Sequence, residues 1–399
     1  MAKRTQPRRN VAGSREDARL IAIRAHGDNK ELIEEFVKVK SAPTIIRMAM
    51  QWGYILRVRT RWAGDADMRD NFGTRAINDL TDLGIGPDAI QRFASVQHIE
   101  VELYTQGLNS LDAAAVLDAA SEIPWEYLLS AATQSVGRFE SLLVTRCLSN
   151  DSTIALTKPR NVLFVESAPG RIGQIYNFED EETRLGAAVN LEENVNPKDN
   201  NGLTFSRTEP LSKLKGRLSG KAWQAVHVTG VDTHQAAWLI EDFYSAVARR
   251  TDVIDESDRL HDGMILRGDR DSELPVRYDE LADLLIEPQK PPGVITLNLY
   301  YSGARTAREL VRRGAYAALG FLDEINDEFG ELFFQAFYWA WCHDNRSIPD
   351  AFLDAWSTMD GDRIHGTSIV IWLGRSMVGR SDTSARRRAR TKKSQSGAH

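Results

Sequence analysis

The stretch VITLNLYYSGARTARELVRRGAYAALGFLDEIND, residues 294–327, decides the fold. It begins as an apolar run, turns at Ser302-Gly303, continues with apolar residues at helical spacing, and enters a second apolar run. This order predicts a buried strand, a sharp turn, a crossover helix and a second, parallel strand. Such a layout often presents a reactive side chain where the first strand ends. Tyr300 and Tyr301 lie at that end, and neither is an obvious nucleophile.

The same alternation of strands and helices extends to both sides of this stretch. The predicted strands are SLLVTRCL (141–148), NVLFVES (161–167), AWQAVHVTG (222–230), GMILRGD (263–269), GVITLNLY (293–300), AYAALGFL (315–322) and TSIVIWLG (367–374). Several of them are continuously apolar, which is typical of strands that are buried on both faces of a sheet. We therefore predict an α/β fold with a mostly parallel central sheet and helices on both faces. The last strand serves either as a sheet edge that pairs with another chain or as an internal strand.

The pattern before this alternation is mainly helical. Apolar residues recur at helical spacing in ELIEEFVKV (31–39) and in PTIIRMAMQWGYIL (43–56). HIEVELY (98–104) alternates apolar and polar residues and is predicted to be the first strand of the alternating region that follows. The predicted organisation has four parts: a basic flexible N-terminus (1–14), a mainly helical N-terminal region (15–97), an α/β domain (98–375) and a disordered basic tail (376–399).

Composition excludes several classes of protein. The chain of 399 residues is 42% hydrophobic and 27% charged, which is the balance of an ordinary globular protein. No apolar run approaches the roughly 20 residues of a membrane span, and the N-terminus lacks the apolar core of a secretion signal. We therefore expect a cytoplasmic protein without membrane contact. Cys147 and Cys342 lie far apart and outside metal-ligand spacing, so we expect neither a disulfide nor a metal site, and no cofactor.

The two ends of the chain are basic, although the net charge is -6. The basic residues there are Lys3, Arg4, Arg8, Arg9, Arg386, Arg387, Arg388, Arg390, Lys392 and Lys393. The remainder of the chain is therefore strongly acidic. Basic ends of this kind are compatible with contact to nucleic acid or to an acidic partner, but the body offers no basic groove to support such contact.

Two histidines accompany the end of the strand at 222–230. His227 lies within the apolar strand, which is typical of a hydrogen-bonded core residue. His234 follows Asp232 and Thr233 at a predicted helix start, where Asp232 or Thr233 is expected to cap the helix. The alternative is that one of the two histidines is a general base that activates a nucleophile on a neighbouring strand.

Taken together, these segments resemble the CHAT domain, a caspase-like cysteine peptidase fold. The resemblance covers roughly Val101 to Trp356. Its landmarks occur in family order: IPWEYL, NVLFVESAPG, VHVTG, DGMILRGD with the following YDELADLL, LNLYYSG, and RRGAYAALGFLDEIND with FFQAFY after it. The resemblance implies a caspase-like three-layer sandwich, preceded here by the mainly helical N-terminal region.

The resemblance also implies that the catalytic dyad is missing. In the family, the strand that reads VHVTGV here ends as His-x-x-Gly-His-Gly, and its second histidine is the base; that position is Val231. The nucleophilic cysteine of the family falls at Tyr300. Valine cannot accept a proton, and a phenol with an ordinary pKa of about 10 is a poor substitute for a thiolate.

The sequence therefore predicts a catalytically inactive CHAT pseudopeptidase that acts as a protein-binding or regulatory subunit. The expected partner is an active caspase-like protease or another component of a bacterial defence or signalling assembly. The candidate cleft residues are His227, Asp232, His234, Tyr300, Tyr301 and Ser302. We expect Tyr300 to be partly buried near Val231 with its hydroxyl hydrogen-bonded. The alternative is an active hydrolase or peptidase with a relocated nucleophile, either Ser302 or a cysteine, paired with His234.

Overall fold

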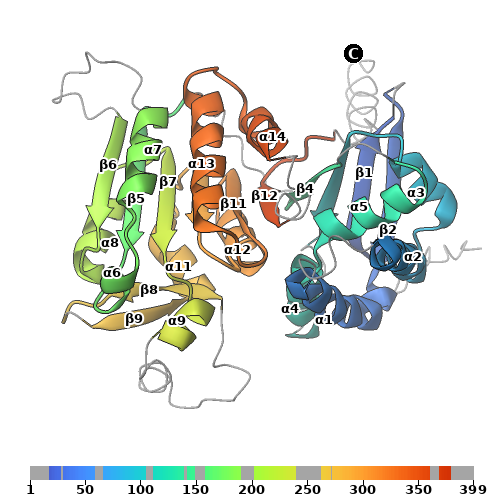
Figure 1. Cartoon of the computed structure of the whole chain (residues 1–399), viewed down its shortest axis with the longest axis horizontal. Coiled ribbons are helices and arrows are strands. Elements are labelled where there is room, and N and C mark those ends of the chain that lie inside the picture. The colour runs from blue at the N-terminus through green and yellow to red at the C-terminus, as the bar shows by residue number, and fades with distance from the viewer. Residues whose placement is uncertain are drawn as a thin grey trace, which may run out of the picture.

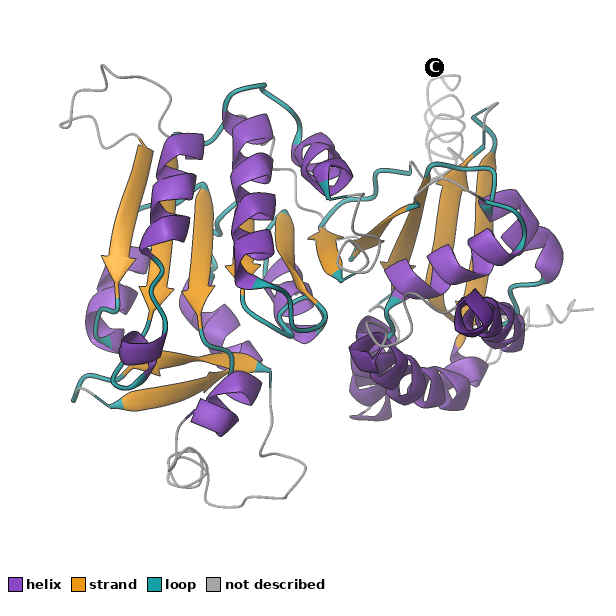
Figure 2. Ribbon diagram, in the orientation of Figure 1, coloured by secondary structure: helices purple, strands orange, loops and turns teal. Residues whose placement is uncertain are grey.

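One large sheet organises the chain. The computed structural model describes residues 18–27, 30–58, 66–104, 111–138, 142–148, 158–189, 202–239, 262–270, 272–359 and 368–378. Within these ranges ten strands form a sheet in the order β2-β1-β3-β4-β12-β11-β10-β7-β5-β6, and β8 and β9 form a separate small sheet (Figures 1 and 2). Most neighbouring pairs in the large sheet are parallel. The predicted α/β fold with a mostly parallel central sheet is confirmed.

The strands of the second half of the sheet are buried on both faces, apart from the edge strand at residues 202–207, which is mostly half-buried. These strands are β5 (Asn161–Ser167), β6 (Gly202–Arg207), β7 (Ala225–Gly230), β10 (Val294–Asn298), β11 (Ala317–Phe321) and β12 (Ile369–Leu373). Along β5, Leu163 and Val165 belong to one apolar cluster, whereas Val162 and Phe164 belong to another. Successive side chains of a strand point to opposite faces, so a continuously apolar strand requires a cover on each face.

Helices supply both covers, which gives this half three layers (Figure 2). One face is covered by α7 (Glu179–Val189), α13 (Asp327–Cys342) and α14 (Ile348–Thr358). The other face is covered by α8 (Leu211–Ser219), α11 (Tyr278–Leu285) and α12 (Arg305–Arg312). Two short helices, α6 (Ile172–Ile175) and α9 (Thr233–Leu239), follow β5 and β7 at the ends of these strands (Figure 1).

The N-terminal half of the sheet is covered by helices whose buried residues belong to the same apolar cluster as Leu163 and Val165 of β5. Its strands are β1 (Arg19–His26), β2 (Leu32–Lys38), β3 (His98–Leu103) and β4 (Leu143–Cys147). Its helices are α1 (Ala42–Val58), α2 (Ala66–Asp82), α3 (Pro87–Phe93), α4 (Leu111–Glu122) and α5 (Trp125–Ser135). A proline lacks an amide hydrogen and is not accommodated inside a helix, which explains why α4 and α5 separate around Pro124.

One prediction for this half was wrong. The segment at 31–39 was predicted to be helical but contains β2, whereas the strand predicted at 98–104 forms as β3. Ile33 and Val37 are the buried residues of β2, and a spacing of four fits one face of a helix and one face of a strand equally well. Antiparallel pairing with β1 makes this segment a strand rather than a helix. Because β1 also pairs with β3, the sheet continues across the predicted domain boundary at residue 97.

The segment at 263–269 forms a strand, as predicted, but it lies outside the large sheet. It contains β8 (Gly263–Arg267), which among the described residues pairs with β9 (Glu273–Arg277) and with single residues elsewhere. The hairpin lies at the carboxyl ends of the parallel strands (Figure 1). Ile265 connects it to two of them, because its amide donates to the Val231 carbonyl and its carbonyl accepts from the Ser167 hydroxyl.

β12 joins the two halves as an internal strand, which settles the open question about its position. It is antiparallel to β11 on one side and parallel to β4 on the other. At the junction Trp372 lies opposite Arg146. Arg146 is fully buried, and its guanidinium donates to both oxygens of Glu126 at 2.8 and 2.6 Å and to the Ile123 carbonyl at 2.9 Å.

The two chain ends lie largely outside the described residues. The predicted basic N-terminus, residues 1–14, and residues 379–399 of the predicted tail are outside the described residues. The tail was predicted to begin at residue 376, but residues 376–378 are held in place, because the Met377 amide donates to buried Glu100 at 2.7 Å. Among the described residues, no helix combines the length and the apolar character that crossing a membrane requires.

Replacing Arg146 by alanine is expected to destabilise the protein by about 3–5 kcal/mol, because the change leaves the Glu126 carboxylate buried without its partner. Urea unfolding measures this loss. Arg92→Ala is the control, since it removes an exposed ion pair with Glu35 and is expected to cost no more than about 1 kcal/mol. Equal effects of the two substitutions would contradict the role assigned to Arg146 at the junction.

Candidate functional site

The two strand ends singled out in the sequence are neighbours. β7 and β10 are adjacent and parallel, and Thr229 lies opposite Asn298 in their register. Val231 and Tyr300 each follow this pair by two residues, so both lie at the carboxyl edge of the sheet. In an open α/β sheet this edge is where ligands commonly bind.

Val231 is a core residue. It is 0% exposed and belongs to a small apolar cluster with Ile172, Ala236 and Ile265. Its carbonyl accepts a hydrogen bond from the Ile265 amide at 3.0 Å. Val231 therefore anchors the β8–β9 hairpin to the end of β7. Its side chain has no group that could act as a general base.

Tyr300 is half-buried, and its hydroxyl is hydrogen-bonded. The hydroxyl donates to Asp327 Oδ1 at 2.8 Å, and the ring packs against the apolar cluster under α13. Burial, and then the hydrogen bond to Asp327, raise the pKa of Tyr300 well above its usual value near 10. A phenol held in this way stays protonated, so Tyr300 is unsuited to be a nucleophile. The predicted partial burial and hydrogen bond of Tyr300 are confirmed.

Tyr301 occupies an unusual backbone conformation. Its φ angle is 55°, in the left-handed region that residues other than glycine rarely adopt. Its ring centre lies 4.9 Å from that of His234, and its hydroxyl donates to Glu324 at 3.3 Å. The left-handed turn thus directs a tyrosine toward the histidine at the neighbouring strand end.

Ser302 is a structural residue of the turn rather than a nucleophile. It is 3% exposed. Its hydroxyl donates to the Leu299 carbonyl at 2.7 Å and accepts from the Phe321 amide at 3.2 Å. A hydroxyl in this position ties the turn to β11, so it cannot also approach a substrate without breaking the turn. The geometry does not favour the Ser302–His234 alternative.

Neither cysteine is placed to replace the missing nucleophile. Cys147 is buried in β4, in the N-terminal half of the sheet. Cys342 is the last residue of α13, roughly 22 Å along the helix from Asp327 at about 1.5 Å per residue. Burial raises the pKa of the Cys342 thiol to about 12, which opposes formation of the reactive thiolate.

Asp232 and His234 lie together at the start of α9. Asp232 Oδ1 accepts from the amides of His234 at 2.7 Å and Gln235 at 3.1 Å, which is the predicted capping role. Asp232 is only 1% exposed, and its Oδ2 has no hydrogen-bond partner among the described residues. Burial raises the pKa of this carboxyl to about 6.

His234 is paired with a carboxylate that sequence reasoning missed. Its Nε2 lies 3.0 Å from Asp262 Oδ1, just before β8. Asp262 also lies 3.9 Å from Arg305 of α12, and Arg305 donates to Glu122 of α4 at 2.6 Å. Glu122, Arg305, Asp262 and His234 thus form a continuous polar chain from the N-terminal half to the strand ends. These residues are far apart in sequence, so no local sequence pattern indicates that they form this polar chain.

His227 does not border the cleft, contrary to its place among the candidate cleft residues. It is 0% exposed and stacks on Phe164 with ring centres 5.2 Å apart. Its two ring nitrogens lie 2.7 Å from the Thr296 hydroxyl and 2.8 Å from Glu181 Oε1. His227 is a hydrogen-bonded core residue, as its position inside an apolar strand indicated.

The surroundings of the strand ends are acidic and aromatic. Tyr176 contributes a third tyrosine, and its hydroxyl accepts from Gln235 Nε2 at 2.6 Å. The acidic residues near these tyrosines are Asp232, Asp262, Glu324 and Asp327. We call this set of tyrosines and carboxylates the acidic rim. One part of its signal was visible in the sequence as the acidic start of α13 at Asp327, which by itself indicates only a favourable helix N-terminus.

The rim offers no metal centre. In the ranges that the structure describes, no group of three or more His, Cys, Asp or Glu side chains is arranged to hold a metal ion. Comparison of the chain with family models gives no match, and no curated protein matches it.

A pH dependence of stability follows from Glu331, one turn into α13. Burial, and then the nearby Glu181 carboxylate, raise the pKa of Glu331 from 4.5 to about 7, although Arg184 lies 3.2 Å away. A pKa raised on folding means that the folded protein binds the proton more tightly than the unfolded one. Stability from this group is therefore lost as the pH rises from 4.5 to 7.

We expect Glu331→Gln to remove this dependence. The free energy of unfolding of the variant, relative to wild type, should increase as the pH rises through that window and level off above it. Urea unfolding across the pH range measures the difference. Glu328→Gln is the matched control on the same helix, because its side chain is 74% exposed and should leave the slope unchanged. The same slope in both variants would refute the assignment to Glu331.

Proposed function

We propose that this protein is a catalytically inactive, CHAT-like pseudopeptidase that binds a protein partner at the carboxyl edge of its sheet. One observation carries the proposal: the adjacent strand ends that would present base and nucleophile hold a buried valine and a hydrogen-bonded tyrosine. The resemblance in the order of sequence landmarks supports the family, and the confirmed α/β sandwich is compatible with it.

The acidic rim supports binding rather than chemistry. Tyrosines offer large, rigid surfaces with a polar tip, and they are enriched where binding energy concentrates. The carboxylates of Glu324 and Asp327 are exposed at this rim, so a basic segment of the partner complements it best. The proposed partner is a cytoplasmic protein, either an active caspase-like protease or another subunit of a bacterial defence or signalling assembly.

Activity probes test the loss of catalysis. Serine-directed and thiol-directed covalent probes are expected to leave the native protein unlabelled, because Ser302 and both cysteines are buried. His234→Ala should give the same result as wild type. Labelling of the wild type that disappears in His234→Ala would show a relocated active site and overturn the pseudopeptidase proposal.

Partner binding is tested by gentle purification of the tagged protein from its own host, followed by native mass spectrometry. A stoichiometric protein partner is expected. Tyr301→Ala and Glu324→Gln should each weaken its binding by about tenfold or more, which corresponds to about 1.4 kcal/mol. Tyr54→Ala is the control, because Tyr54 is 63% exposed on α1 and outside the rim. A partner that both rim variants retain at full affinity binds elsewhere and contradicts the proposed role of the rim.

A further inference from the structure

A groove lies between α8 and α11, on the face of the sheet opposite α7 and α13. Its volume is about 610 Å³, and β9 and the segment after α11 complete its walls. The groove is separate from the acidic rim, because none of the rim residues lines it.

The floor of the groove is apolar and accessible. Val276, Leu218 and Leu285 are buried at its base. Leu211 of α8 and Leu284 of α11 line it and are only partly buried, as is Leu274 of β9. A groove that leaves leucines from three elements partly exposed is suited to an apolar ligand face.

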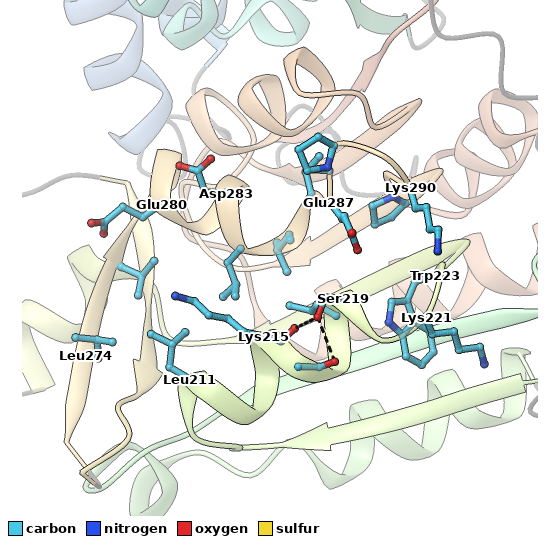
Figure 3. A pocket seen from close by; sticks show the side chains of 18 residues that line it. Leu211, Lys215, Ser219, Lys221, Trp223, Leu274, Glu280, Asp283, Glu287 and Lys290 are labelled. Atoms are coloured by element: carbon cyan, nitrogen blue, oxygen red, sulfur yellow. Dashed lines mark hydrogen bonds between the residues drawn. The ribbon is translucent and has the colours of Figure 1, made fainter.

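The walls of the groove carry opposite charges. Figure 3 shows Glu280, Asp283 and Glu287 along the α11 side. Lys215 and Lys221 lie along the α8 side. Asp283 also contacts Arg313 of α12 but stays 70% exposed, so it remains available to a ligand. Lys221 lies 4.7 Å from the Trp223 ring centre, which holds its ammonium group beside the groove. Lys290 lies near one end of the acidic side.

The elements around the groove favour a helix over an extended strand as its occupant. An extended peptide would have to add to β9, but β9 contains Pro275, which has no amide hydrogen for a sheet ladder. A helix needs no backbone partner, and it lies naturally between two helices with its apolar stripe on the floor. Its flanks then face the acidic α11 side and the basic α8 side.

We propose that this groove binds an amphipathic helix of a partner protein, with basic residues along one flank of its apolar stripe and acidic residues along the other. The basic flank pairs with Glu280, Asp283 and Glu287, and the acidic flank with Lys215 and Lys221. This inference does not depend on whether the strand ends are catalytically inactive.

Three synthetic peptides of about 18 residues test the proposal, a length above the roughly 12–15 residues below which isolated helices are marginal. All share one leucine stripe. The first has one basic and one acidic flank, the second has two basic flanks, and the third has two acidic flanks. Fluorescence anisotropy with the full chain is expected to show the first binding at least about tenfold more tightly than the other two.

A charge reversal in the protein makes the test sharper. Lys215→Glu with Lys221→Glu turns both sides acidic, so the preference should move to the peptide with two basic flanks. The matched control is Lys213→Glu, the same charge change on the same helix at a residue that pairs with Glu209 outside the groove. The control is expected to keep the wild-type preference, with folding of each variant checked by urea unfolding.

Several results would overturn the proposal. They are equal binding of the three peptides, binding of none, or a shift of preference caused by Lys213→Glu. Self-association of the chain in sedimentation experiments, if lost in the Lys215→Glu and Lys221→Glu protein, would assign the groove to a second copy instead.

Discussion

The close approach of the Ser302–Gly303 turn to β11 is the constraint on which the second half of the sheet depends. A β carbon at Gly303 would lie 2.9 Å from the Phe321 carbonyl carbon, so only glycine fits there. The Gly303 amide donates to the Phe321 carbonyl at 2.7 Å, and the Gly303 carbonyl accepts from the Trp372 indole at the same distance. Because Trp372 lies opposite Arg146, this turn is connected through β12 to the N-terminal half of the molecule.

The residues that the turn requires differ from the residues at the neighbouring strand ends, where a catalytic group would lie. Ser302 and Gly303 are held by backbone contacts, and substituting either breaks the turn. Tyr300 and Val231, at the strand ends beside it, contact mainly side chains and the hairpin. A chain can therefore change both of those positions and keep the sheet.

The sequence allowed the parallel strands and the two adjacent strand ends to be predicted, because continuously apolar runs and turn residues are local signals. It failed at β2, where the spacing of Ile33 and Val37 fits helix and strand alike. It also failed to place β8 outside the large sheet, since an apolar run does not say which strand it pairs with. Asp262 and Tyr176 join the site only through contacts across many residues, so no spacing could have indicated them.

Two costly features at the strand ends are not demanded by the fold. A left-handed conformation at Tyr301 costs about 1–2 kcal/mol relative to glycine, and an unpartnered buried oxygen such as Asp232 Oδ2 costs about 1–3 kcal/mol. Glycine at residue 301 would relieve the first cost, and asparagine would cap α9 as well as Asp232 does without burying a charge. Strain of this kind clusters at functional sites, although left-handed residues such as Lys30 and Asn345 also occur elsewhere in this chain. Their position on neighbouring strand ends therefore favours a binding function at this edge over a purely structural one.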